Sequence, residues 1–274
     1  MNGTKFESVL RRDRQAILAA LVILTALAWG YVLWLTRNMA MSADASGMPG
    51  MELGMAVGPQ IRPWTVTDLL FGFLMWAVMM AGMMLPSAVP MILLYARVGR
   101  QAELEQKPFA ATGWFAGGYL LAWTFFSLLA AGLQDGLVRA ELLTPMLASA
   151  NNFIGGGILI TAGLYQWSAL KFRCLTSCRT PLQFIQQHGG FQKHALPSLG
   201  LGLRHGIYCI GCCWALMLLL FVGGIMNIVW IAGLAIMVLL EKAMSDGRNV
   251  SRLVGLALII AGISLIWDNF SPPG

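Results

Sequence analysis

The sequence predicts an all-α integral membrane protein, a polytopic bundle of about seven transmembrane helices. Of its 274 residues, 58% are hydrophobic and 11% are charged, whereas a soluble domain carries about 25% charged residues. The apolar residues fall in runs of about 20, the length of a helix that crosses a bilayer. Five cysteines in this length exclude a disulfide-rich secreted scaffold. The +6 net charge does not indicate nucleic acid here, because in a membrane protein the positions of the charges matter more than their sum.

The predicted spans follow one another along the chain. The first, 16–35, comes after a basic N-terminus, 1–15, and before a segment, 36–68, that has no hydrophobic periodicity. The other six form one membrane domain over 69–270, at 69–96, 113–134, 150–170, 205–222, 225–241 and 253–270. The run 205–241 is too long for one untilted helix, so we divide it at Gly223-Gly224, which with Asn227 favours a turn.

The basic residues predict the orientation of these spans. Fifteen of the 18 lysines and arginines fall in the N-terminus and in every second connection, and three fall in the others. The positive-inside rule then places the N-terminus and the long connection 171–204 in the cytoplasm. It places the segment 36–68 and the C-terminus in the periplasm of a bacterial inner membrane. A stretch inside the long connection, Leu182–Gln187, is amphipathic and is expected to lie on the membrane surface.

Two interpretations of the first helix stay open. Basic residues precede it and Ala43-Asp44-Ala45 resembles a signal-peptide cleavage site. The apolar run, however, is longer than the 7–15 residues of a signal sequence. We expect a retained helix, with cleavage as the alternative.

Methionines are concentrated in two parts of the chain. In the span 69–96 they repeat every four residues, and residues four apart share a helix face. Thioether sulfur is a soft ligand that suits Cu(I) and is poor for Mg²⁺ or Ca²⁺. The alternative is that methionine only fills gaps between helices. We interpret the span as an ion path through Met75, Met79, Met80, Met83 and Met84, and the periplasmic segment as an outer capture site with Met48, Met51 and Met55.

All five cysteines are expected near the cytoplasmic face. Cys174 and Cys178 follow the fourth span, and three more cysteines lie near the start of the fifth. A structural disulfide is disfavoured in that reducing compartment, whereas thiolate ligation of a metal is compatible with it. At about 100° per residue, one face of the fifth span carries His205, Cys209, Cys212, Cys213 and Met217. The alternative is that these cysteines serve as small hydrophobic residues in helix packing.

These motifs resemble those of a bacterial family known as predicted metal-binding integral membrane proteins. The resemblance rests on Trp76–Pro90, Cys174–Pro181, Gly206–Trp214 and Glu241-Lys242. It implies a polytopic inner-membrane protein whose Cys and Met residues bind metal, and it implies no particular reaction. The methionine stripe separately resembles the pore motif of high-affinity copper transporters.

The preferred hypothesis is a protein that handles Cu(I), with Zn²⁺ as the alternative ion. It would transport copper or deliver it to a copper protein or chaperone. No catalytic residues are expected, because no nucleophile–base set and no paired carboxylates lie at membrane depth. Two rival hypotheses are a membrane thiol redox enzyme and a non-catalytic assembly subunit of a membrane complex. Glu241 is expected to pair with Lys171 or Lys242 at the cytoplasmic edge.

Overall fold

The structure is a computed structural model that describes residues 15, 17–34, 37, 66–106, 108–144, 148–149, 151–244 and 246–268. Over these residues the chain is helical, apart from turns and a single β-bridge between Leu143 and Ser149. The predicted all-α class is therefore confirmed. The outer capture residues Met48, Met51 and Met55 lie outside the described residues.

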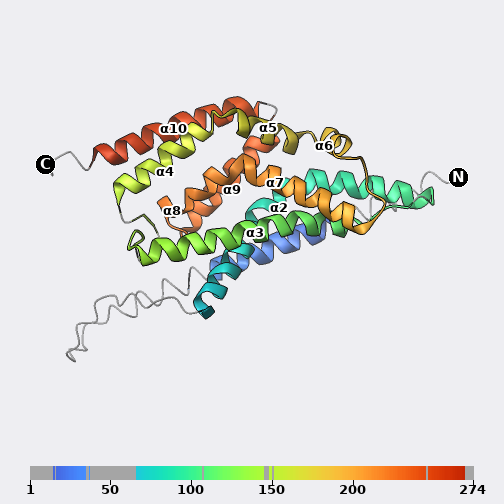
Figure 1. Cartoon of the computed structure of the whole chain (residues 1–274), viewed down its shortest axis with the longest axis horizontal. Coiled ribbons are helices and arrows are strands. Elements are labelled where there is room, and N and C mark those ends of the chain that lie inside the picture. The colour runs from blue at the N-terminus through green and yellow to red at the C-terminus, as the bar shows by residue number, and fades with distance from the viewer. Residues whose placement is uncertain are drawn as a thin grey trace.

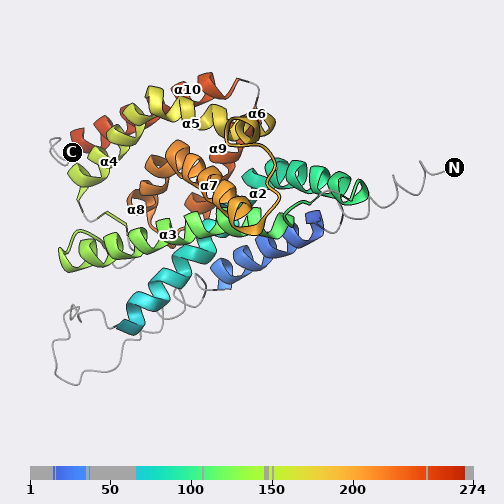
Figure 2. The same cartoon turned by 45° about the vertical axis from the view of Figure 1, so that its right-hand side comes forward.

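The helices form three layers (Figures 1 and 2). Helices α4 and α10 run together along one side, α7 and α9 lie in the middle, and α2 and α3 occupy the other side. After an N-terminal helix, Ile17–Trp34, the elements are α2 Val66–Leu104, α3 Thr112–Arg139, α4 Asn152–Tyr165, α5 Ala169–Arg179, α6 Pro181–Gln187, α7 Ala195–Leu218, α8 Leu220–Gly223, α9 Ile228–Ala243 and α10 Gly247–Trp267.

The connection expected at 171–204 is largely helical. It contains most of α5, all of α6 and the first turns of α7, which begins at Ala195 and not at the predicted 205. Pro197 does not prevent this, because proline is tolerated in the first turn of a helix, where its missing N–H has no intrahelical partner. The predicted span 150–170 is also different, since the chain bends by 64° between α4 and α5. The amphipathic stretch Leu182–Gln187 does form a helix, α6.

Five of the described helices are long and apolar enough to cross a membrane. The bent pair α4–α5 adds a sixth if it is one broken span. Helix α9 has 16 residues, which is short for a span. The number seven therefore stays a prediction. The predicted turn is present, because Gly224 adopts a φ of 91° and Asn227 caps α9 by accepting a hydrogen bond from Trp230 N at 3.2 Å.

Backbone contact between α3 and α7 fixes the centre of the molecule. A Cβ atom added at Gly118 would lie 2.0 Å from the carbonyl oxygen of Leu199, and one at Gly202 would lie 2.0 Å from that of Phe115. One turn further on, Gly206 lies against Ala122 and Tyr119. Because only glycine permits this approach, the register of α7 on α3 is set by the two backbones.

Helices α4 and α10 pack by the same principle. Cβ atoms added at Gly156 and Gly163 would lie 2.7 Å from the carbonyl oxygens of Gly262 and Gly255. Helix α10 is otherwise largely exposed, which suits a helix that faces lipid.

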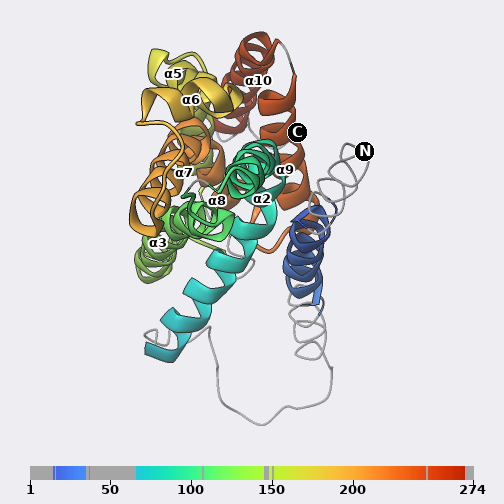
Figure 3. The same ribbon diagram turned by 90° about the vertical axis from the view of Figure 1, so that its right-hand side faces the viewer.

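The N-terminal helix lies alongside α2, on the side away from α7 (Figure 3). It packs by Ala28 and Trp29 against Gly82, and a Cβ atom at Gly82 would be 2.9 Å from that of Ala28. Trp29 and Val32 line a small void with Met79 and Met83. This helix therefore covers one face of the methionine stripe.

Candidate metal centre

The thiol groups gather where α5 crosses α7. Cys209, Cys212 and Cys213 are buried on the face of α7 that turns into the bundle. Their side chains lie within hydrogen-bonding reach of one another, and Cys178 from α5 is within reach of Cys209 and Cys212. Cys174 lies one turn earlier, against the backbone of Gly211. The structure therefore brings all five cysteines together, as their topology predicts, and all five are free.

The thiols are engaged in local hydrogen bonds. The Sγ atoms of Cys212 and Cys213 donate to the backbone oxygen of Cys209 at 3.1 and 3.0 Å. Among the described residues, no three or more His, Cys, Asp and Glu side chains already form a group that could hold a metal ion. To reach a shared metal ion, these two side chains would have to rotate away from that carbonyl, which a change in χ1 would achieve without moving the helix.

Cys209 has two polar neighbours from other helices. Its Sγ atom lies 3.2 Å from the hydroxyl of Tyr119 on α3 and 2.9 Å from Nζ of Lys242 on α9. The same ammonium donates to Ser87 Oγ on α2 at 3.0 Å. Tyr119 also hydrogen-bonds the backbone oxygen of Met84 at 3.1 Å. Cys209 is therefore the point at which α2, α3, α7 and α9 meet through polar groups.

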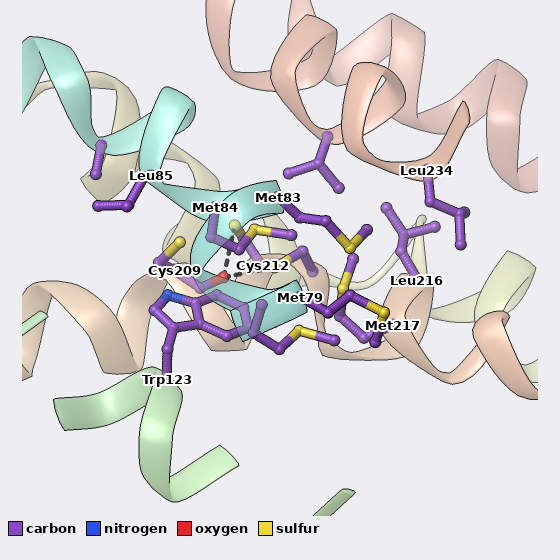
Figure 4. Close-up of a cluster of buried hydrophobic side chains, with 14 of the residues drawn as sticks. Met79, Met83, Met84, Leu85, Trp123, Cys209, Cys212, Leu216, Met217 and Leu234 are labelled. Carbon is purple, nitrogen blue, oxygen red and sulfur yellow. Dashed lines mark hydrogen bonds between the residues drawn. The ribbon is translucent and has the colours of Figure 1, made fainter. Parts of the chain in front are cut away.

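The predicted methionine stripe is buried next to these thiols. Its five members, Met75, Met79, Met80, Met83 and Met84, are at most 7% exposed, and Met217 on α7 is 1% exposed. Figure 4 shows Met79, Met83 and Met217 directed into one interior space between α2 and α7, with Met84 beside Cys209 and Cys212. Helices α2 and α7 run in opposite directions. Of the candidate ligands on α7, Met217 therefore lies nearest the end of the stripe that begins at Met75. The sulfur groups thus change from thioether to thiol along the axis of α2.

His205 occupies an aromatic environment one turn before Cys209. Its ring lies 5.7 Å from that of Tyr119 and 5.3 Å from that of Phe184, between ring centroids. The side chain is buried, and Nδ1 has no hydrogen-bond partner among the residues that the structure describes. A buried nitrogen without a partner is unfavourable, so this atom is available to a ligand that comes close. His188, which the sequence places in a polar loop, stacks on Phe184 at 4.3 Å.

A buried ion pair lies behind the thiols. Glu241 pairs with Lys171 at 2.8 Å, and the two side chains are 2% and 0% exposed. Ser251 donates to the other carboxylate oxygen at 3.1 Å, and Gln166 accepts from Lys171. Of the two partners expected for Glu241, the structure selects Lys171. Adjacent helical residues point in different directions, so Lys242 is left to face Cys209.

Sequence analysis missed three residues beside the thiols: Ser87, Tyr119 and Lys242. Lys242 was considered only as one of two partners for Glu241 at the cytoplasmic edge, and serine and tyrosine are common in apolar helices. The one available signal is the Glu241-Lys242 pair in an otherwise apolar span, since charged residues at membrane depth are costly and usually functional.

The chain matches the model of a known protein family. Residues 73–265 match the model of a family described as PpoB2, copper chaperone. No curated protein and no solved structure matches the chain. The matched region contains α3 to α9 in full and every residue of the thiol cluster and the methionine stripe, whereas the N-terminal helix and the segment 36–68 lie outside it.

Proposed function

Because the chain belongs to the family described as PpoB2, copper chaperone, we propose that it binds Cu(I) inside a bacterial inner membrane and passes the ion to a copper protein. The observation that carries this proposal is the meeting of four thiols from α5 and α7 with the thioethers of α2. Thiolates and thioethers are the soft ligands that Cu(I) prefers.

The order of the ligands gives the proposed path its direction. Neutral thioethers bind Cu(I) more weakly than thiolates do, so an ion that enters at Met75 and Met79 moves to stronger ligands as it approaches Cys209. With the orientation predicted by the positive-inside rule, this direction is inward. The Met-rich segment 36–68 would collect the ion on the periplasmic side, through Met48, Met51 and Met55.

The cysteines would form the main binding site. Cys209 and one of Cys212 and Cys213 would bind the ion as its two thiolates, after the second thiol leaves the carbonyl of Cys209 and turns to the ion, and Cys178 lies within reach of the same position. Cu(I) is preferred over Zn²⁺ because the neighbouring ligands are thioethers, which zinc sites seldom use. A Cys-rich tetrahedral set with His205 would be the zinc alternative.

Metal analysis of the purified protein tests this site. We expect the protein in detergent to bind Cu(I) in competition with a chromogenic Cu(I) chelator, and the variant Cys212→Ser/Cys213→Ser to lose most of the bound ion. Cys174→Ser is the matched control, because this residue lies at the edge of the cluster and should change binding little. Full copper occupancy in the double-serine protein, with a normal elution profile, would rule out the site. If the protein binds Zn²⁺ but not Cu(I), the metal of the proposed site is zinc and not copper.

A transport assay tests the methionine path. Met79→Leu/Met83→Leu should slow copper uptake into cells or vesicles and leave equilibrium binding at the thiols unchanged, since these residues are proposed to lie on the path and not at the end of it. Met244→Leu is the control, because Met244 is exposed and lies outside the stripe. Equal uptake by both variants would remove the path from the proposal.

Two further measurements separate the rivals. Reporter fusions should place the segment 36–68 outside and the α5–α6 region inside, and the opposite result would reverse the direction. A thiol redox enzyme would show a disulfide that forms and breaks during turnover, whereas a copper site should show thiols that bound Cu(I) protects from alkylation.

A further inference from the structure

Lys242 is a polar neighbour of the thiols that carries a full charge. Its ammonium lies 2.9 Å from Cys209 Sγ and 3.0 Å from Ser87 Oγ. The side chain therefore reaches the thiol cluster at Cys209, from the last turn of α9.

No carboxylate in the described part of the chain forms an ion pair with this lysine. Glu241, its neighbour in sequence, is committed to Lys171 at 2.8 Å and to Ser251. Two other ion pairs among the described residues, Arg100–Glu103 and Arg139–Asp135, join residues on the same helix. A cation buried among apolar helices is costly unless an anion compensates it. Of the two described side chains that this ammonium contacts, Ser87 and Cys209, the thiol of Cys209 is the one that can become an anion.

We propose that Lys242 is the built-in counter-charge of the copper site, so that the complex of one Cu⁺ ion with two cysteine thiolates is neutral as a whole. This inference rests on the proposed function. Two thiolates and one Cu⁺ carry a charge of −1, and the ammonium brings the sum to zero. Lys242 is thus a positioning residue, because it acts on the ion through Cys209 and does not ligate it.

The exchange of ions balances. Cu⁺ forms bonds to the sulfur atoms of Cys209 and of a second cysteine, any S–H bond at these two atoms breaks, and the proton leaves the site. The bound cluster then consists of Cu⁺, two thiolates and the ammonium, and its net charge is zero. Neutrality of the bound cluster avoids the cost of an isolated charge in an apolar interior.

Three substitutions separate charge from shape and hydrogen bonding. Lys242→Arg keeps the charge, Lys242→Gln keeps a hydrogen-bond donor without charge, and Lys242→Met removes both. We expect Cu(I) affinity to fall by roughly a hundredfold in the Gln and Met variants, because each leaves an uncompensated anion in the site. The Arg variant should stay within about tenfold of the wild type, since it restores the charge but not the shape.

A control variant tests whether any change at this end of α9 has the same effect. Lys171→Met/Glu241→Met removes the buried ion pair that Glu241, the residue before Lys242, forms with Lys171, and it leaves the thiols in place. It should bind Cu(I) like the wild type. The probe is Cu(I) in competition with a chromogenic chelator, measured on full-length protein in detergent after its unfolding temperature has been recorded.

The outcomes are distinct. If the wild type binds no Cu(I), the proposed function fails, whatever Lys242 does. If the wild type binds and Lys242→Gln binds equally well, the counter-charge is refuted. If the Arg and Gln variants lose affinity to the same extent, Lys242 acts only by its shape and the proposal is also refuted. Should Lys242→Met not fold, the comparison of Arg with Gln still decides.

Discussion

Replacing Gly202 with alanine should separate α7 from α3 and damage both the fold and the thiol site. The new Cβ atom would lie 2.0 Å from the carbonyl oxygen of Phe115, whereas ordinary contact begins at 3.4 Å. The Cβ atom and the carbonyl oxygen are each fixed to a helix backbone and cannot rotate away, so the helices must move apart by roughly 1 Å or more. Overpacking of this kind costs about 1–3 kcal/mol of stability.

The same movement reaches the copper site. Tyr119 is on α3 and Cys209 is on α7, so their 3.2 Å contact crosses the interface that would widen. A gap wider by roughly 1 Å breaks this hydrogen bond, so Cu(I) affinity should fall together with the unfolding temperature.

Gly200→Ala is the matched control. Gly200 lies two residues away in the same helix, and nothing lies within 4 Å of its added Cβ atom. The identical change there should stabilise α7 by up to about 1 kcal/mol through helix propensity. Thermal unfolding of the two variants and the wild type is compared in one detergent, with the loss of soluble protein as the readout. If Gly202→Ala is as stable as Gly200→Ala, the backbone contact between α3 and α7 does not set the register.

Other changes have effects that the contacts specify. Glu241→Gln leaves Lys171 buried without a counter-ion and should cost about 3–5 kcal/mol of stability, whereas Lys171→Met/Glu241→Met should recover most of it; equal unfolding temperatures for the two would contradict this. Tyr119→Phe removes hydrogen bonds to Cys209 and to the Met84 carbonyl, so Cu(I) affinity should fall by roughly fivefold, and an unchanged affinity would make this hydroxyl purely structural. Asn227→Ala removes the N-cap of α9 and should lower stability by about 1 kcal/mol with no effect on copper binding, as a melting curve and a chelator titration on one sample can show.

Much of the fold follows from local pattern. The apolar runs locate most of the helices, although α2 ends eight residues after the predicted 96 and α7 begins ten residues before the predicted 205. The turn at Gly224 and the cap at Asn227 follow from residue chemistry that acts within four positions. The start of α7 at Ala195 does not follow from local pattern, because Pro197 and Arg204 are residues typical of a loop. It can be placed only once the preceding helix, α6, is known to end at Gln187.

The site divides in the same way. The cysteines of α7 share a face by helical period, and the order of the spans brings Cys178 to them. Lys242 and Tyr119 reach Cys209 from positions 33 and 90 residues away. Such contacts depend on how four helices rotate against one another, which no local pattern determines. The position of the Lys242 ammonium beside Cys209 is therefore the feature of the site that the sequence alone does not predict.

The N-terminal helix has a consequence for access to the methionine stripe. Trp29 and Val32 lie around the same narrow gap as Met79 and Met83, so this helix covers the two thioethers on one side. Thioethers that lose such a cover are open to oxidation to the sulfoxide. In a variant that lacks residues 17–34, an added oxidant should therefore convert Met79 and Met83 faster than in the full-length protein, and mass spectrometry of the sulfoxides would measure the difference.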